Sequence, residues 1–166
     1  MTQKATKKLY DKDALKKLYD KDFPLWAEVN LMLLKEKAYE QVDWENLFEE
    51  IEDMARSDLK ACISYLAVIL EHLYKLEHFK NLAGGETAGS GWIKSILTAR
   101  ERLKRLLNKH PSLKQKLPDN LQEAWEDAVS ELRVWLIQNG YDPDQFEFPK
   151  DCPYTYKDTL TNHTKT

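Results

Sequence analysis

The residues best suited to chemistry in this sequence are one histidine and two nearby acids. His72 lies in the middle of the most apolar segment, where a histidine can ligate a metal or move a proton if a carboxylate is close. Glu50 and Asp53 could supply that carboxylate if their helix packs antiparallel to the helix of His72. The alternatives are a core histidine with internal hydrogen bonds and an acidic face that is solvated and paired with Arg56 and Lys60.

No catalytic or metal-binding motif accompanies these residues. A di-iron bundle requires a glutamate three residues before a histidine, and none of the four histidines has one. The His-Glu-x-x-His zinc pattern, the Gly-x-Ser-x-Gly elbow and phosphate-binding glycine loops are also absent from the sequence. Cys62 lies among apolar residues, which favours an inert thiol over a nucleophile. The sequence therefore assigns no catalytic residue, cofactor or metal ligand, and it favours a protein that is not an enzyme.

Basic residues concentrate in the segment 92–116, whereas 41–60 is acidic. Arg102, Arg105 and Lys109 are spaced to form one stripe on a helix, on the side away from its apolar residues. Such a stripe can bind an acidic protein partner or the phosphates of a nucleic acid. The simpler alternative is that the basic helix packs beside an acidic helix of the same chain or is solvated.

The spacing of apolar residues predicts helices and no sheet. Asp22 caps the first clear helix, which carries Trp26, and the next begins at Asp43. We expect the second helix to bury one face, comprising Trp44, Leu47, Ile51 and Met54. Arg56–Asp58 is either a joint between helices or a bend in a longer one. Residues 59–79 are apolar on nearly every side, which is typical of a central helix.

Later segments continue the helical pattern. A glycine-rich loop at 84–91 precedes a helix to about His110, a short helix follows Pro111, and another helix ends at Asn139-Gly140. The expected fold is therefore an all-α, single-domain bundle of about five helices with a partly extended C-terminal tail. Trp135 falls off the stripe formed by its apolar neighbours, so we expect an exposed tryptophan that marks an interface.

The N-terminus contains a duplication. Residues 7–13 recur as residues 16–22, nine positions later, which is two and a half helical turns. The spacing is too short for a solenoid repeat. We expect residues 1–18 to be a mobile extension, residues 19–160 to form the helical domain, and residues 161–166 to be a disordered tail.

Composition narrows the protein class. The 166 residues are 42% hydrophobic and 32% charged, with a net charge of −3, which excludes collagen-like and low-complexity chains and argues against a protein that coats nucleic acid. No apolar run is long enough for a secretory signal or a membrane helix. Cys62 and Cys152 fit reduced thiols better than a disulfide framework. We expect a soluble, cytoplasmic protein.

Several stretches resemble a bacterial family best known from cyanobacteria, the domain of unknown function number twenty-nine. The most specific is Asp-Trp-Glu-Asn at 43–46, and others lie at 49–54, 72–75, 111–113 and 152–155. The resemblance covers about residues 19–160, and the duplicated N-terminus and the glycine-rich loop depart from the family pattern. It implies a small helical fold and no particular activity.

Three functions remain open. The first, which we favour, is a non-catalytic helical module that binds another protein or a second copy of itself. The second is a nucleic-acid-associated regulator that uses the basic segment 92–116. The third is a metal-dependent enzyme built on Glu50, Asp53 and His72.

Overall fold

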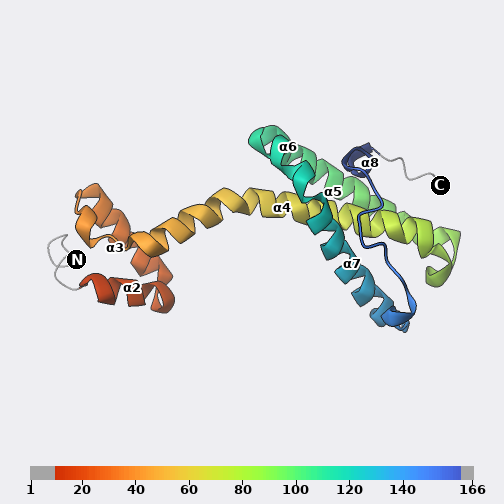
Figure 1. Cartoon of the computed structure of the whole chain (residues 1–166), viewed down its shortest axis with the longest axis horizontal. Helices are drawn as coiled ribbons and strands as arrows, with labels where there is room; N and C mark the ends of the chain where they lie inside the picture. The colour runs from red at the N-terminus through yellow and green to blue at the C-terminus, as the bar shows by residue number, and fades with distance from the viewer. Residues whose placement is uncertain (1–9, 162–166) are drawn as a thin grey trace. The chain divides into compact units, whose positions relative to one another are not determined.

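The computed structural model describes residues 10–161, and every regular element in that range is helical (Figure 1). The α-helices are α2 (Lys12–Lys21), α3 (Phe23–Lys35), α4 (Trp44–His78), α5 (Gly89–Lys109), α6 (Ser112–Lys116), α7 (Leu121–Gln138) and α8 (Tyr156–Thr161). Short 3-10 turns are η1 (Tyr39–Gln41), η2 (Lys80–Ala83), η3 (Glu86–Ala88), η4 (Leu117–Asn120) and η5 (Pro143–Gln145). The predicted all-α class is confirmed. Over the same range, no helix combines the length and apolar character needed to cross a bilayer.

The chain divides into two compact units, Met1–Arg56 and Ser57–Thr166. The boundary falls at the Arg56–Asp58 joint suggested by the sequence, but α4 is continuous through it. Ser57 therefore lies within a longer helix. This is the second of the two predicted alternatives, and no new helix begins at Ser57.

The N-terminal unit consists of α2, α3, η1 and the first turns of α4. Its buried hydrophobic residues are Leu15, Trp26, Val29, Leu33 and Val42. The Asp11 carboxylate accepts a hydrogen bond from the Ala14 amide at 2.7 Å and caps α2. Asp22 caps α3 as predicted, because its carboxylate accepts from the Leu25 amide at 3.2 Å.

The expected boundary between residues 18 and 19 does not coincide with the end of an element. It falls inside α2, and Leu15 is only 1% exposed in the core of the N-terminal unit. Residues 12–18 therefore belong to this unit and not to an extension. An amphipathic turn is stable where it can bury its apolar side, and α2 does so against α3. Residues 1–9 and 162–166 lie outside the described range.

A buried hydrogen-bond network explains the most specific part of the sequence signature. Asp43 is only 5% exposed. Its carboxylate accepts hydrogen bonds from the indole Nε1 of Trp26 at 2.9 Å and from the side-chain amide of Asn46 at 2.7 Å. The Asp43 backbone N–H donates to Oδ1 of the buried Asn30 at 2.9 Å. Asp43 thus joins α3 to the beginning of α4, which gives the signature residues Asp43 and Asn46 a structural role.

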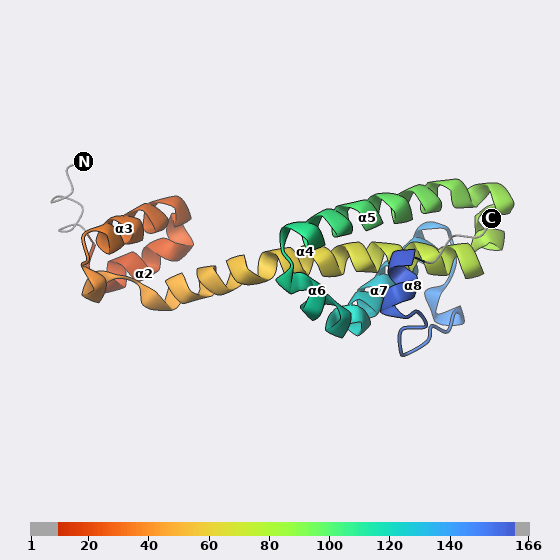
Figure 2. The same ribbon diagram turned by 90° about the horizontal axis from the view of Figure 1, so that it is seen from above.

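The C-terminal unit is built around the second part of α4. As predicted, this part is buried on nearly every side, and its core also draws residues from α5, α6, η4 and α7 (Figures 1 and 2). Leu66, Ile69, Leu103, Trp125 and Leu132 are fully buried. The predicted end of α7 is confirmed, since Gly140 has φ 82°, a left-handed conformation that favours glycine and stops the helix.

The C-terminal tail is partly extended, as predicted, and is tied to α7 and α4. The indole of Trp125 donates to the Pro149 carbonyl at 2.9 Å, and the Cys152 amide donates to the Gln122 side chain at 2.9 Å. The Tyr154 hydroxyl donates to Glu77 at 2.7 Å, and burial, together with this hydrogen bond, raises the pKa of Tyr154. The segment therefore covers one side of the C-terminal core.

Candidate interaction surfaces

The three residues proposed for a metal or catalytic site are not brought together by antiparallel helices. Glu50, Asp53 and His72 all lie on the single helix α4, the first two in the N-terminal unit and the third in the C-terminal unit. Glu50 instead accepts a hydrogen bond from the Tyr19 hydroxyl at 2.6 Å. Across residues 10–161, no group of three or more acidic, histidine or cysteine side chains is arranged to hold a metal ion.

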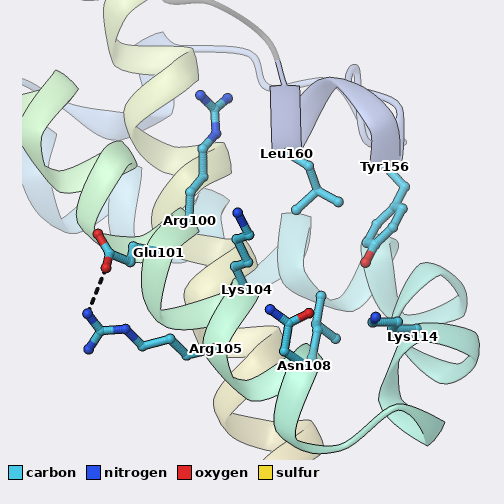
Figure 3. A pocket seen from close by; sticks show the side chains of 9 residues that line it. Arg100, Glu101, Lys104, Arg105, Asn108, Lys114, Tyr156 and Leu160 are labelled. Atoms are coloured by element: carbon cyan, nitrogen blue, oxygen red, sulfur yellow. Dashed lines mark hydrogen bonds and ion pairs between the residues drawn. The ribbon is translucent and has the colours of Figure 1, made fainter.

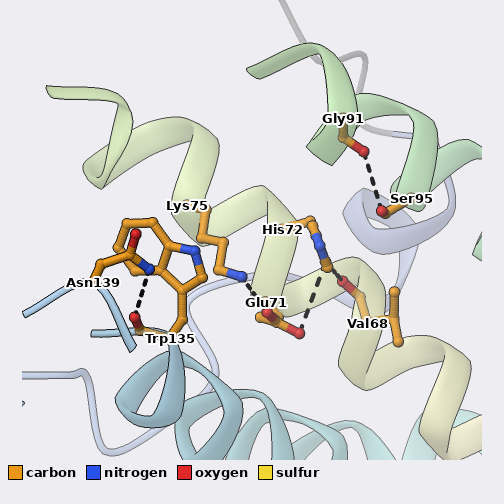
Figure 4. A network of polar contacts seen from close by, with 8 residues as sticks. All are labelled: Val68, Glu71, His72, Lys75, Gly91, Ser95, Trp135 and Asn139. Atoms are coloured by element: carbon orange, nitrogen blue, oxygen red, sulfur yellow. Dashed lines mark hydrogen bonds and ion pairs between the residues drawn. The ribbon is translucent and has the colours of Figure 1, made fainter. Parts of the chain in front are cut away.

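His72 belongs to a buried polar network whose other members the sequence analysis missed (Figure 4). Its Nδ1 donates to the Val68 carbonyl at 2.8 Å and lies 3.8 Å from the Glu71 carboxylate. Glu71 forms an ion pair with Lys75, which is only 4% exposed. The Lys75 Nζ also lies 5.3 Å from the ring centre of Trp135, within range of a cation–π contact. The sequence did contain a signal for this network, because Glu71 and Lys75 are four residues apart in an apolar helical segment and can therefore pair.

The surroundings of His72 favour its neutral form. Burial is the largest influence and lowers the pKa of His72, while the nearby Glu71 carboxylate and the Val68 carbonyl oppose this effect. Nδ1 of His72 is thus occupied by the Val68 carbonyl, and the carboxylate beside the histidine is shared with Lys75. These contacts match the alternative of an internally hydrogen-bonded core histidine.

The expectation of an exposed Trp135 is wrong. Its ring stacks on Phe79 with centroids 5.5 Å apart and meets Trp92 edge-on at 5.9 Å, so the side chain is half-buried against the C-terminal core. The exposed apolar residues of α7 are its neighbours Val134 and Ile137. Trp135 lies outside the narrow apolar stripe of α7 because it contacts Phe79, directly after α4, and Trp92 near the beginning of α5.

The predicted buried face at the beginning of α4 is also wrong, and its exposure is the most prominent surface feature. Phe48 is 56% exposed, Ile51 53% and Trp44 36%, while Met54 is exposed as well. Only Leu47 is partly buried in the N-terminal core. Trp44, Phe48 and Ile51 lie at positions i, i+4 and i+7 and form one side of the helix. We call these three residues the apolar stripe.

The apolar stripe is held in place at its beginning. The Trp44 indole donates to the Tyr39 carbonyl at 2.8 Å, and its ring lies 5.8 Å from the ring of Phe48. The residues from 44 to 56 also include five acids and one base, so the stripe lies in a negatively charged segment. The acids are Glu45, Glu49, Glu50, Glu52 and Asp53.

The predicted basic stripe is exposed on α5, but its residues face different surroundings. Arg105 is paired with Glu101 at 2.7 Å on its own helix, and Arg102 lines a separate small hollow with Lys94 and Tyr65. Neither Arg102 nor Lys109 forms an ion pair with any residue that the structure describes.

The sequence did not predict a larger groove, which Arg105 of the predicted stripe lines together with residues outside that stripe (Figure 3). Its volume is about 760 Å³, and it is bounded by α5, Lys114 of α6, and Tyr156 and Leu160 of α8. Because α8 joins this surface from about fifty residues further along the chain, helical periodicity alone does not reveal the groove.

Comparison with known proteins gives a family but no activity. The sequence matches the family described as Domain of unknown function DUF29 over residues 18–164. No curated protein and no solved structure matches the chain. The match covers most of both compact units and agrees with the earlier resemblance.

Proposed function

We propose that this chain, which belongs to the DUF29 family of domains of unknown function, is a non-catalytic module that binds a partner protein through the apolar stripe of α4. The observation that carries the proposal is the exposure of Trp44, Phe48 and Ile51 on one side of a regular helix. Contiguous apolar side chains exposed to water have an unfavourable hydration free energy, and a partner that covers them removes this cost. Helix-in-groove and helix-on-helix recognition use this i, i+4, i+7 spacing.

The rigidity of the stripe supports a recognition role. Trp44 is fixed by its hydrogen bond to the Tyr39 carbonyl and by the adjacent Phe48 ring. Less side-chain entropy is therefore lost when a partner binds, and aromatic residues of this kind commonly supply most of the binding free energy at an interface.

Charge supports one kind of partner over another. Two copies of the α4 segment 44–56 packed on each other would bring ten acids against two bases, which opposes self-association. A helix with an apolar face flanked by Lys and Arg is complementary to this segment. We therefore assign the stripe to a basic amphipathic helix of another protein. A cytoplasmic location is part of the proposal, and the two free cysteines, Cys62 and Cys152, support it.

Two labelled model peptides test the proposal directly. Both have the same Leu face and form helices, but one carries Lys and Arg beside that face and the other carries Glu. We expect fluorescence anisotropy to detect saturable binding of the basic peptide to the full chain and binding at least about tenfold weaker for the acidic peptide, because charge complementarity contributes on the order of 1.4 kcal/mol. Equal affinity for both peptides, or binding of neither, would contradict it.

Matched variants locate the binding surface. Phe48→Gln/Ile51→Gln replaces two of the three residues of the apolar stripe. The control, Leu97→Gln/Ile137→Gln, replaces two apolar side chains of similar exposure in the C-terminal unit. We expect only the first variant to lose the basic peptide and the protein partners that full-length wild type captures from host lysate treated with nuclease. A wild-type dimer that dissociates in the stripe variant would instead assign the surface to a second copy. Partners that disappear with nuclease would favour the nucleic-acid alternative.

A further inference from the structure

The groove beside α5 combines an apolar surface with positive charge, and it is independent of the apolar stripe. Its apolar part is made by Leu107, Tyr156 and Leu160, of which Leu107 is also part of the C-terminal core. Lys104 and Lys114 lie on the α5 and α6 side of the same space (Figure 3). The volume of about 760 Å³ is within the range of sites that hold small organic molecules, roughly 300–1,000 Å³.

The charged groups of the groove are not equivalent. Arg100 donates to the Thr159 carbonyl at 2.8 Å and thereby holds α8 against α5. Arg105 is neutralised by Glu101. Lys104 and Lys114 are exposed and form no ion pair with any described residue. The positive charge that remains available therefore comes from these two lysines, which lie on different helices.

We propose that this groove binds a small organic anion, a carboxylate or phosphate attached to an apolar or aromatic body. The anionic group lies between Lys104 and Lys114, within reach of the Asn108 side chain, and the apolar body lies against Tyr156 and Leu160. Ammonium groups on flexible stems neutralise an anion without fixed geometry, so carboxylate and phosphate fit equally. A neutral ligand gains only the apolar contact, and an inorganic anion gains only the charge.

Four ligands separate these contributions in titrations of the full chain by calorimetry. Octanoate and phenyl phosphate supply the two anionic groups, and octanamide and phenol are their neutral counterparts. We expect at least one anion to bind saturably and at least about tenfold more tightly than its neutral counterpart, because only the anion gains charge-assisted contacts with the lysines. Tighter octanoate binding identifies a carboxylate ligand, and tighter phenyl phosphate binding identifies a phosphate ester.

A charge-matched pair of variants assigns the site. Lys104→Ala/Lys114→Ala and Arg102→Ala/Lys109→Ala each remove two exposed positive charges, but only the first pair includes groove lysines. We expect the first variant to weaken anion binding about tenfold or more and the second to stay within about twofold of wild type. Ligand-induced NMR shifts should appear at the Leu107 and Leu160 methyl groups. Equal weakening in both variants, shifts confined to the apolar stripe, or no saturable binding up to about 10 mM would overturn the proposal.

Discussion

Both parts of α4 carry apolar residues at helical spacing, but their surroundings differ. In the N-terminal unit, Phe48 and Ile51 are more than half exposed, whereas Leu66 and Leu70 in the C-terminal unit are fully buried. Among the described residues, seven of the ten large hydrophobic side chains that are exposed belong to the N-terminal unit. The seven are Phe23, Leu31, Tyr39, Trp44, Phe48, Ile51 and Met54.

This difference shows that an amphipathic pattern identifies a face that needs covering without identifying what covers it. The second part of α4 is covered by α5, α7 and the C-terminal tail of its own unit. In the N-terminal unit, Leu47 of α4 packs against the buried residues of α2 and α3, whereas Trp44, Phe48 and Ile51 on the adjoining side of the helix remain exposed. We attribute the open side to binding and the covered part to stability, and the following measurements test that division.

The largest expected contrast is between two alanine substitutions on α4. Leu70→Ala should lower the free energy of unfolding of the C-terminal unit by about 4 kcal/mol, because it removes a fully buried side chain and leaves a cavity. Ile51→Ala should change the stability of the N-terminal unit by less than about 0.5 kcal/mol, because the side chain is already 53% exposed. Urea unfolding followed by circular dichroism measures both. Comparable losses would show that the stripe is buried within the chain in solution.

The buried ion pair gives a slightly smaller effect. Lys75→Met should destabilise the C-terminal unit by about 3 kcal/mol, since the Glu71 carboxylate is then buried without its cation. The double variant Glu71→Gln/Lys75→Met should recover part of this loss, because no unpaired charge remains. Thermal and urea unfolding of the two variants measure the difference. A double variant no more stable than Lys75→Met would mean that the lysine acts mainly through its contacts with Trp92 and Trp135.

The Asp43 network stabilises the other unit. Asp43→Ala removes the partner of the Trp26 indole and the carboxylate at the beginning of α4, and we expect a loss of about 2 kcal/mol confined to the N-terminal unit. Amide hydrogen exchange should accelerate about thirtyfold in α3, and the amides of α7 should keep the wild-type rate. Acceleration in both units would show that they unfold as one, and the comparison between them would then lose its energetic basis.

Much of the fold could be predicted because local rules determine it. Asp22 and Gly140 are a cap and a stop whose conformations depend on a few neighbouring residues. The central position of residues 59–79 follows from their being apolar on nearly every side. The ends of α5 and α7 follow from the glycine, proline and asparagine residues beside them.

The candidate surfaces could not be predicted in the same way, because they depend on contacts between distant residues. Ile51 lies at an apolar position with helical spacing, and the pattern within its own segment does not show whether another helix covers it. Trp135 is covered by Phe79 and Trp92, which are more than forty residues away along the chain. The sequence placed the basic stripe on the correct helix. The groove that brings Lys104 and Lys114 together is formed only because α8 packs beside α5, and the local sequence does not show this contact.

The smallest expected effect is a pH dependence that arises from His72 in the C-terminal unit. Burial lowers the pKa of His72 below its usual value near 6.5, so the unfolded chain binds a proton more readily than the folded chain does. The contribution of the neutral histidine to stability is therefore complete above the unfolded pKa and is lost as pH falls from about 6.5 through the lower folded pKa. His72→Gln should flatten the pH dependence of the unfolding free energy of the C-terminal unit between about pH 6.5 and 5. Urea unfolding across that range measures this slope. An unchanged slope in the variant would mean that His72 does not produce the pH dependence.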